Sequence, residues 1–380
     1  MKHQSDLPQQ QPQQWSAPDI MATVGPTLEK TEDLRRAIEA GARWFRLPCG
    51  YRQRPHVENA QAVIAAAAAV AIEVQLLLDL PSSRPRTGAM DELRLNEGDY
   101  VLFWDPEDPR SAGSQKNGIS KVPLPGLSEL LGKLVPRQRM WFCDGRLNFV
   151  VEELRDSSVF ARMVQGSVPL KASNSLFLPD SPSAFTPLTA ADSALLKAFI
   201  AQGVLPDWIA LSLIASPDDV RNARIKVRRL LGNDVKIMAK FETVAAVECA
   251  GEIIAESDGI MVARGDLGLA VGYIHLPEVQ EKLVLAARRA EKICVVATQV
   301  MEGFAETGLP QRAELSDLSL IARQRANVVM LGKETVFSPR PIDCIRLAHE
   351  LLTYETRRFE LASRPQKRFP VSKQPHVVQR

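Results

Sequence analysis

Several charged and hydroxyl residues in this sequence stand at or just after the end of a short apolar run. In the segment GIMVARGDLG, the apolar residues 260–262 give way within a few positions to a cation, a glycine and a carboxylate. A surface turn could have this composition by itself. The same pattern recurs along the chain, at Arg46, Asp79, Lys240, Glu242, Arg264, Asp266, Thr298 and Glu334. Each charged residue alone fits a structural salt bridge, but together the residues predict one site if the fold gathers the ends of the runs.

These residue types form a coherent chemical set. The carboxylates of Glu242 and Asp266 are suitable ligands for Mg²⁺ or Mn²⁺, hard cations that keep water and bridge substrate oxygens. Lys240 and Arg46 supply positive charge for a phosphate or for a developing enolate. Thr298 offers a hydroxyl group for proton relay. The set therefore predicts a site that binds a metal and an anion.

The elements that must position these residues are short apolar runs separated by amphipathic helical patterns, which is typical of βαβ units and a parallel sheet. Eight runs are expected to be strands: residues 20–24, 44–47, 74–78, 208–213, 235–239, 259–262, 293–297 and 328–331. This number predicts an α/β fold, a (β/α)₈ TIM barrel, whose strand ends meet at one face. An open doubly wound sheet would need a G-x-G-x-x-G loop after its first strand, and the sequence there is VGPTLEK.

Residues 88–186 interrupt the alternation with turn-rich segments and short β-like runs such as residues 100–103 and 149–151. This pattern predicts a small all-β lid domain inserted after the third strand, where it would hang over the catalytic face as a mobile lid. The expected domains are a disordered N-terminal tail at 1–18, a discontinuous barrel at 19–87 and 187–358, the lid at 88–186, and a basic flexible tail at 359–380.

The composition is that of an ordinary globular protein and argues against several functional classes. The chain is 45% hydrophobic and 24% charged with a net charge of +2, so we expect neither a nucleic-acid nor a membrane partner. The longest apolar run, residues 62–72, is far shorter than the roughly 20 residues of a membrane span. The scattered cysteines and the polar start without a signal-peptide core favour a cytoplasmic location.

A further signal comes from segments that follow one another in a fixed order. They are MATVGPTLEKTEDLRRAIEAGARWFRL, LLLDLPSSRPRTG, WFCDGRLNFVVEE, FLPD, IMAKFE, SDGIMVARGDLGL, ATQVME, RAELSD and VMLGKET. Together they resemble the pyruvate kinase family over about residues 20–355, and the second is similar to that family's LLDTKGPEIRTG-type segment. The resemblance implies a (β/α)₈ barrel with a β lid after the third strand. It also implies phosphoryl transfer from phosphoenolpyruvate to ADP, followed by protonation of the enolate to pyruvate.

The resemblance implies roles for individual residues. Lys240 would stabilise the transferring phosphoryl group and the enolate, and Glu242 and Asp266 would hold Mg²⁺ or Mn²⁺. Thr298 would help to relay the proton, and Arg46 would contact a phosphate. The expected substrate-binding residues are Gly265, Asp266, Thr298, Arg86 and Arg264, with the glycine allowing close approach of a carboxylate to backbone N–H groups.

The departures from the family pattern are concentrated on one side of the expected site. Pro48, Gly50 and Tyr51 stand where the family has asparagine, serine and histidine, and Leu80 replaces a threonine. These positions, with Asp79, usually hold K⁺ in the family. Only Asp79 remains as a residual ligand, so we expect the K⁺ site to be lost and activity to be independent of K⁺. The nucleotide side departs too, and no counterpart of the family's C-terminal α/β domain is expected in this sequence.

Three functions remain open from the sequence. The first is a divergent pyruvate kinase, in which ADP would bind Arg46, Arg86 and lid groups such as Lys171. The second is a Mg²⁺-dependent lyase or enolising enzyme that acts on pyruvate, oxaloacetate or a related 2-keto acid without a nucleotide. The third is an inactive regulatory homologue, which intact metal carboxylates argue against. A homo-oligomer would be compatible with each of them.

Overall fold

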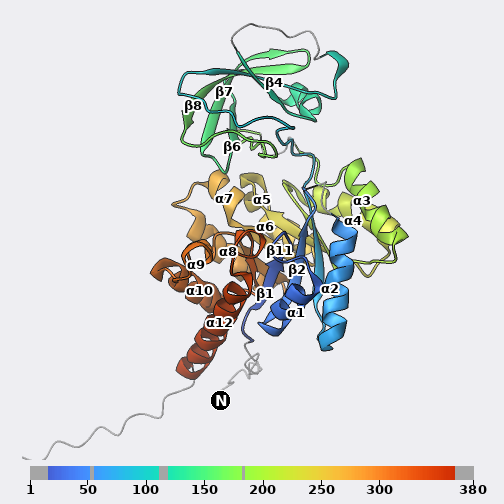
Figure 1. Cartoon of the computed structure of the whole chain (residues 1–380), viewed down its shortest axis with the longest axis vertical. Helices are drawn as coiled ribbons and strands as arrows, with labels where there is room; N and C mark the ends of the chain where they lie inside the picture. The colour runs from blue at the N-terminus through green and yellow to red at the C-terminus, as the bar shows by residue number, and fades with distance from the viewer. Residues whose placement is uncertain (1–15, 52–54, 111–118, 182–184, 364–380) are drawn as a thin grey trace, which may run out of the picture.

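The computed structural model describes residues 16–51, 55–110, 119–181 and 185–363, and its chain forms a barrel with a smaller β domain above it (Figure 1). Eight parallel strands close the barrel in the order β1-β13-β12-β11-β10-β9-β3-β2. Their bounds are β1 Asp19–Thr23, β2 Ala42–Pro48, β3 Gln75–Leu80, β9 Trp208–Leu211, β10 Lys236–Phe241, β11 Gly259–Ala263, β12 Ile293–Ala297 and β13 Val328–Leu331. The predicted α/β barrel is confirmed.

Helices surround the barrel and join its strands. Their bounds are α1 Thr31–Glu39, α2 His56–Val70, α3 Ala190–Ala201, α4 Pro217–Leu231, α5 Val244–Glu248, α6 Ala250–Glu256, α7 Arg264–Val271, α8 Leu276–Arg289, α9 Glu302–Thr307, α10 Arg312–Gln324, α11 Lys333–Val336 and α12 Pro341–Ser363. Local sequence fixes several of their starts. Ser216 and Asp219 form a capping box around Pro217 at the start of α4, and Thr189 with Asp192 does the same for α3.

The barrel strands read as continuous apolar runs because both of their faces are buried. One face packs against the helices in a core that includes Ile209, Ile260 and Val296. The other face points into the barrel, where the buried residues are Met21, Trp44, Leu77, Trp208, Ala210, Met238, Met261, Ala263, Val295, Ala297, Val328 and Met330. The interior is therefore a packed core over most of its height.

The alternation of side chains along a strand carries the polar residues into the same interior. Arg46 lies two positions after the interior residue Trp44, Asp79 two after Leu77, and Lys240 two after Met238. They form the layer nearest the carboxyl ends of the strands, above the apolar layers. Lys240 thus lies within β10, one residue before its end, and not after a strand that ends at residue 239 as the sequence suggested.

The insertion after β3 is a five-stranded sheet in the order β5-β4-β8-β7-β6. Its strands are β4 Tyr100–Trp104, β5 Ser120–Pro123, β6 Arg139–Phe142, β7 Leu147–Arg155 and β8 Ser158–Gly166, with 3₁₀ turns η2 Leu127–Glu129 and η3 Leu131–Lys133. It has its own apolar core, in which the rings of Phe103, Phe142 and Phe149 contact one another. The predicted lid domain is present as a separate, mostly antiparallel sheet.

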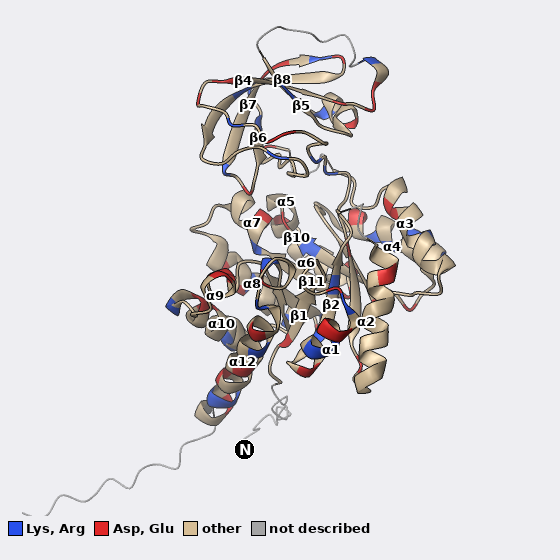
Figure 2. Ribbon diagram, in the orientation of Figure 1, with Lys and Arg blue, Asp and Glu red and all other residues tan. Residues whose placement is uncertain are grey.

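The ends of the chain differ in part from the prediction. α12 continues to Ser363, so residues 359–363, predicted to belong to a flexible tail, are helical. The predicted N-terminal tail up to residue 15 and the remainder of the C-terminal tail from residue 364 lie outside the described residues. Acidic and basic residues are interspersed over the described parts of both domains (Figure 2). No helix in these parts has both the length and the apolar character that crossing a bilayer requires.

Candidate active site

A cavity of about 390 Å³ opens at the carboxyl ends of the barrel strands, below the lid. Barrel residues at its wall include Lys240 and Thr298, and the lid contributes Asp144 and Arg146 from the turn between β6 and β7. The predicted residues that line it are Arg46, Asp79, Arg86, Lys240, Glu242, Gly265, Asp266 and Thr298. The fold therefore brings most of the sequence-predicted site to one place.

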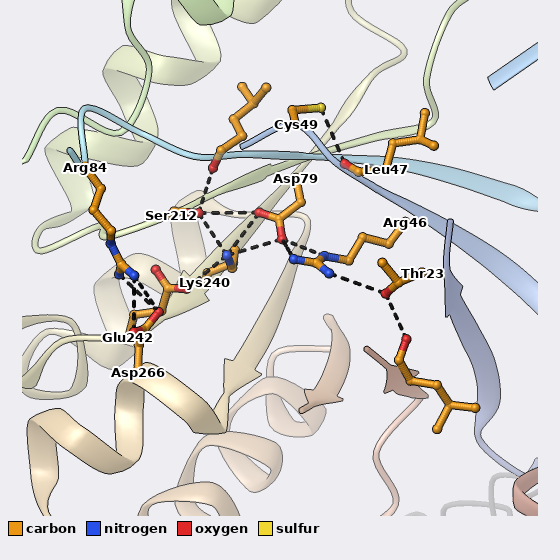
Figure 3. Close-up of polar contacts among 12 residues, drawn as sticks. Thr23, Arg46, Leu47, Cys49, Asp79, Arg84, Ser212, Lys240, Glu242 and Asp266 are labelled. Carbon is orange, nitrogen blue, oxygen red and sulfur yellow. Dashed lines mark hydrogen bonds and ion pairs between the residues drawn. The ribbon is translucent and has the colours of Figure 1, made fainter. Parts of the chain in front are cut away.

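The centre of the site is a buried network of alternating charge (Figure 3). The Lys240 Nζ atom lies 3.0 Å from Asp79 Oδ1 and 2.9 Å from Glu242 Oε1, and it donates to the hydroxyl of Ser212 at 2.8 Å. Arg46 Nε donates to Asp79 Oδ2 at 2.7 Å. These residues come from the upper ends of β2, β3, β9 and β10 or the loops directly after them, so closure of the barrel is what assembles the network.

The network holds its groups in their charged forms. Burial by itself would raise the pKa of Asp79, but the nearby Lys240 and Arg46 lower it to about 2. Burial likewise favours a lower pKa for Lys240, and the charges of Asp79 and Glu242 outweigh this and raise it. Lys240 is therefore a protonated ammonium group at neutral pH, fixed at the base of the cavity and able to face an anion.

Glu242, which contacts Lys240, and Asp266 both line the cavity, and the charge of each acts on the Arg84 guanidinium (Figure 3). Glu242 Oε2 accepts a hydrogen bond from the N–H of Leu213 at 2.7 Å. This bond connects the Glu242 side chain to the loop after β9, in which Leu213 lies. Asp266 lies in the first turn of α7 and is paired with the Arg84 guanidinium at 3.0 Å. The pair of acidic groups is a focus of negative charge that a cation can bind.

The loop after β12 holds Thr298 in a strained conformation. Thr298 and Gln299 have φ angles of 74° and 53°, in the left-handed region that residues with a side chain rarely occupy. The Thr298 hydroxyl accepts from the Gly265 N–H at 3.0 Å, and this bond links the loop to the start of α7. The strain and the bond together place the threonine hydroxyl and the glycine backbone at the wall of the cavity.

Two of the predicted polar residues, Arg264 and Glu334, support this loop through hydrogen bonds to its backbone. The Arg264 guanidinium donates to the Thr298 carbonyl at 2.6 Å and pairs with Asp317 at 2.7 Å. Glu334 is fully buried, and its carboxylate accepts the backbone N–H groups of residues 300, 301 and 332. Their side chains are thus engaged in holding the loop, which is the structural alternative that the sequence left open for each charged residue.

Arg86 follows β3 in the connection to the lid and lies 5.5 Å above the Tyr51 ring. Burial and the neighbouring Arg84 lower its pKa, although an arginine remains charged at neutral pH. It donates to the Ser173 carbonyl at 3.0 Å, and none of the described carboxylates forms an ion pair with it. A partly buried cation of this kind, at the wall of a cavity, is suited to bind an anion.

The comparisons with known proteins agree with this geometry. The family model for the barrel domain of pyruvate kinase matches residues 16–345 of the chain. The chain belongs to the pyruvate kinase family. The family resemblance seen in the sequence is therefore confirmed over both the barrel and the inserted lid.

Individual pyruvate kinases are similar over most of the chain. The enzyme from Methylorubrum extorquens is 32% identical over 330 residues, which cover 86% of this chain and 66% of that protein. The one from Haemophilus influenzae is 31% identical over 333 residues, covering 86% and 67%, and one from Agrobacterium vitis is 30% identical over 336 residues, covering 88% and 67%. The chain therefore corresponds to about two thirds of the length of these pyruvate kinases.

One residue at the centre of the site was missed by sequence reasoning. Arg84 lines the cavity and is bonded to Asp266, yet the sequence singled out only its neighbour Arg86. A signal was available in the segment LLLDLPSSRPRTG, in which Arg84 stands opposite the glutamate of the family's LLDTKGPEIRTG-type segment. Such a reversal of charge beside two expected metal ligands marks a position that interacts with them.

Proposed function

We propose that this member of the pyruvate kinase family transfers the phosphoryl group of phosphoenolpyruvate to ADP, with Mg²⁺ or Mn²⁺, and does so without K⁺. The observation that carries the proposal is the placement of Lys240 between Asp79 and Glu242, with Asp266 alongside, at the base of a cavity under the lid. Phosphoryl transfer requires mainly positioning and charge neutralisation, and this cavity offers fixed groups for both.

The divalent ion fits the donor set at the edge of the network. Among the described residues, no cluster of three or more histidine, cysteine or acidic side chains is placed to hold a metal by itself. Mg²⁺ is usually held by one or two carboxylates, with substrate oxygens and water completing its shell. Glu242 and Asp266 would hold the ion in this manner. When bound, it would neutralise developing negative charge on the phosphoryl oxygens and the enolate.

The protein groups would act on the substrate from three sides. Lys240 would face the transferring phosphoryl group and then the enolate oxygen, and Arg86 would bind phosphate oxygens from the lid connection. The substrate carboxylate would lie at the first turn of α7, beside Gly265, whose N–H is bonded to the Thr298 hydroxyl, and Asp266. Thr298 would pass a proton to the enolate carbon as it becomes the methyl group of pyruvate.

The proposed reaction breaks one P–O bond, forms another and adds one proton to carbon. The bond between phosphorus and the enol oxygen of phosphoenolpyruvate breaks, and a bond forms between phosphorus and the terminal phosphate oxygen of ADP. The enolate that is left gains one proton at carbon, through Thr298 and ultimately from solvent. Water must be kept from the phosphorus during this step, which is the role of the lid above the cavity.

Independence of K⁺ is supported by the surroundings of Asp79. Its Oδ1 atom lies 3.0 Å from Lys240 Nζ, and its Oδ2 atom lies 2.7 Å from the guanidinium of Arg46. Its charge is thus neutralised by two side chains. A monovalent cation at Asp79 would face both of these positive groups at close range, which favours the loss of the site.

The lid and its connection to the barrel would bind ADP. Lys171, which the sequence offered as a lid group for the nucleotide, is exposed and pairs with Glu92 at 2.8 Å. Arg146 lines the cavity from the turn between β6 and β7, and Arg86 does so from the connection to the lid. We therefore place the phosphates of ADP between these two arginines, on the lid side of the phosphoryl group.

The proposal is tested by measuring formation of ATP from phosphoenolpyruvate and ADP with Mg²⁺ in a tetramethylammonium buffer. The wild-type protein should form ATP at a rate that added K⁺ does not change, and Asp266→Asn should lose this activity. If no ATP forms, the same protein is tested for Mg²⁺-dependent exchange of the methyl protons of pyruvate with deuterated water. Exchange without phosphoryl transfer would overturn the proposed function in favour of an enolising enzyme.

A further inference from the structure

The guanidinium of Arg84 forms a two-pronged ion pair with Asp266 in the site. Its Nη1 atom donates to Asp266 Oδ1 at 3.2 Å and to Oδ2 at 3.0 Å, and its Nη2 atom donates to Oδ2 at 3.1 Å. The side chains are 10% and 24% exposed, so the pair is shielded from water. An arginine fork of this geometry satisfies both carboxylate oxygens in the plane where a metal ion would otherwise bind them.

The second carboxylate, that of Glu242, also attracts the Arg84 guanidinium. Burial opposes the charge of Arg84, and the nearby Asp266 and Glu242 outweigh this and raise its pKa. The guanidinium is thus bonded to Asp266 and attracted by the charge of Glu242, the two residues that are proposed to bind the divalent ion. Two cations cannot both lie close to the same two carboxylates in a poorly hydrated site without strong repulsion.

The Arg84 side chain also has unused capacity to bind an anion. Its Nε atom is buried and makes no hydrogen bond with any of the described residues. Its neighbour in the connection to the lid, Arg86, likewise has a buried Nε atom without a hydrogen bond in the described parts of the chain. The two guanidinium groups line one cavity, so a guanidinium released from Asp266 would stand beside a second cation that faces substrate.

We infer that Arg84 is a resident counter-ion of Asp266 that the divalent metal must displace, and that the displaced guanidinium then binds the substrate anion. The inference rests on the proposed metal site of Glu242 and Asp266, but not on the identity of the phosphoryl acceptor. It makes binding of metal and anion interdependent. The metal releases the arginine for the anion, and the anion draws the arginine away from the carboxylate that the metal needs.

The experiment measures binding of Mn²⁺ to the full chain by electron paramagnetic resonance, with no nucleotide or phosphoenolpyruvate present. The variants are Arg84→Gln, which removes the competing charge, and Asp266→Asn, which removes the ligand. Arg139→Gln is the matched control, because Arg139 forms a similar two-pronged ion pair with Asp180 but does not line the cavity. Each titration is repeated with saturating inorganic phosphate as the anion.

We expect Arg84→Gln to bind Mn²⁺ about tenfold more tightly than the wild type without phosphate, since the internal competitor is gone. Arg139→Gln should change the affinity by less than about twofold, and Asp266→Asn should weaken it strongly. Phosphate should tighten Mn²⁺ binding to the wild type and have a smaller effect on Arg84→Gln, because the coupling runs through the arginine.

An Arg84→Gln protein that binds Mn²⁺ no more tightly than the wild type would overturn the inference, as would the absence of Mn²⁺ binding to both proteins. If Arg84→Gln does not fold, Arg84→Lys decides, because lysine keeps the charge but cannot form the fork. Its Mn²⁺ affinity should rise a few-fold, and an unchanged affinity would overturn the inference. Tightened Mn²⁺ binding in a protein that makes no ATP would leave the inference standing and refute the proposed function alone.

Discussion

Replacement of Lys240 by methionine perturbs both the stability and the chemistry of the site in ways that the structure makes calculable. The side chain is 9% exposed and stands between Asp79 and Glu242, which are 4% and 3% exposed. Methionine is similar in shape but removes the ammonium group and leaves both carboxylates with one partner fewer. The variant therefore tests the charge of Lys240 with little change in packing.

The expected loss of stability is about 3 kcal/mol. Removing one partner of a buried ion pair costs about 3–5 kcal/mol. Asp79 retains Arg46 and Glu242 retains the N–H of Leu213, so the cost should lie at the lower end. As a check, the lowering of the Asp79 pKa from 3.8 to about 2, which is the net effect of its two cations after burial has opposed them, corresponds to about 2 kcal/mol. At about 2–4 °C per kcal/mol, the melting temperature should fall by roughly 6–12 °C.

The effect on stability should depend on pH in a defined direction. The pKa of Asp79 is lowered in the folded state, so its contribution to stability is present above its usual value of 3.8 and is lost as the pH falls to about 2. Without Lys240 the pKa of Asp79 should rise. The deficit in melting temperature of Lys240→Met should therefore be largest at neutral pH and should shrink as the pH falls through this window.

The assay pairs thermal unfolding with the rate of ATP formation. We expect Lys240→Met to remain folded at 25 °C and to lose at least about 10²–10³-fold in kcat, because a fixed charge on the transition state is absent. The control is Lys236→Met at the start of the same strand, where the exposed ammonium lies 5.1 Å from the Trp208 ring. It should cost less than about 1 kcal/mol and leave kcat unchanged. A folded Lys240→Met with normal kcat would refute the assigned role.

Further predictions concern the loop, the lid and the monovalent ion. Glu334→Gln should lower stability by about 2 kcal/mol and reduce kcat, since the buried carboxylate accepts three N–H groups that shape the loop of Thr298. Differential scanning calorimetry measures the stability and initial rates measure kcat. Gly145→Ala should raise the KM for phosphoenolpyruvate, because the added Cβ would come within 2.5 Å of Leu269 where the lid touches α7. Activity in Na⁺, K⁺ or tetramethylammonium buffers should agree within about twofold.

Each of these predictions has a result that contradicts it. Gly98→Ala is the control for the lid, because that glycine also has a positive φ but no atom near the position of the added Cβ. Equal changes in KM in the two glycine variants would show backbone strain instead of lid contact. A Glu334→Gln protein with wild-type stability would mean that its hydrogen bonds contribute little. Strong activation by K⁺ would show that a monovalent site survives near Asp79.

The barrel could be predicted from the sequence because its strands are buried on both faces. Segments such as residues 259–262 and 293–297 are short, apolar and flanked by helical patterns, so their type and number were legible. The exact ends of the strands were harder to predict. Asp79 and Lys240 belong to the strands themselves, because a charged residue can be paired inside the top of a barrel as well as in a loop.

The members of the site could be predicted better than the roles of its charges. A closed barrel brings the ends of its strands together, so the polar residues there were expected to meet, and most of them line the cavity. Whether one of them faces substrate or supports a loop depends on contacts with distant segments. Arg264 bonds Asp317, which lies 53 positions away, and Arg84 bonds Asp266, which lies 182 positions away. No local pattern encodes such pairings, so the loop-supporting role of Arg264 and the ion-pair partner of Arg84 became visible only in the fold.

Phosphoryl transfer to ADP is tested directly by a ³¹P NMR spectrum of the protein with phosphoenolpyruvate and Mg²⁺ in buffer free of K⁺, recorded with and without ADP. We expect the phosphoenolpyruvate signal to decay only when ADP is present, while the three signals of ATP appear in an amount equal to the phosphoenolpyruvate consumed. A phosphoenolpyruvate signal that persists with ADP, or that gives inorganic phosphate without ATP, would contradict this expectation.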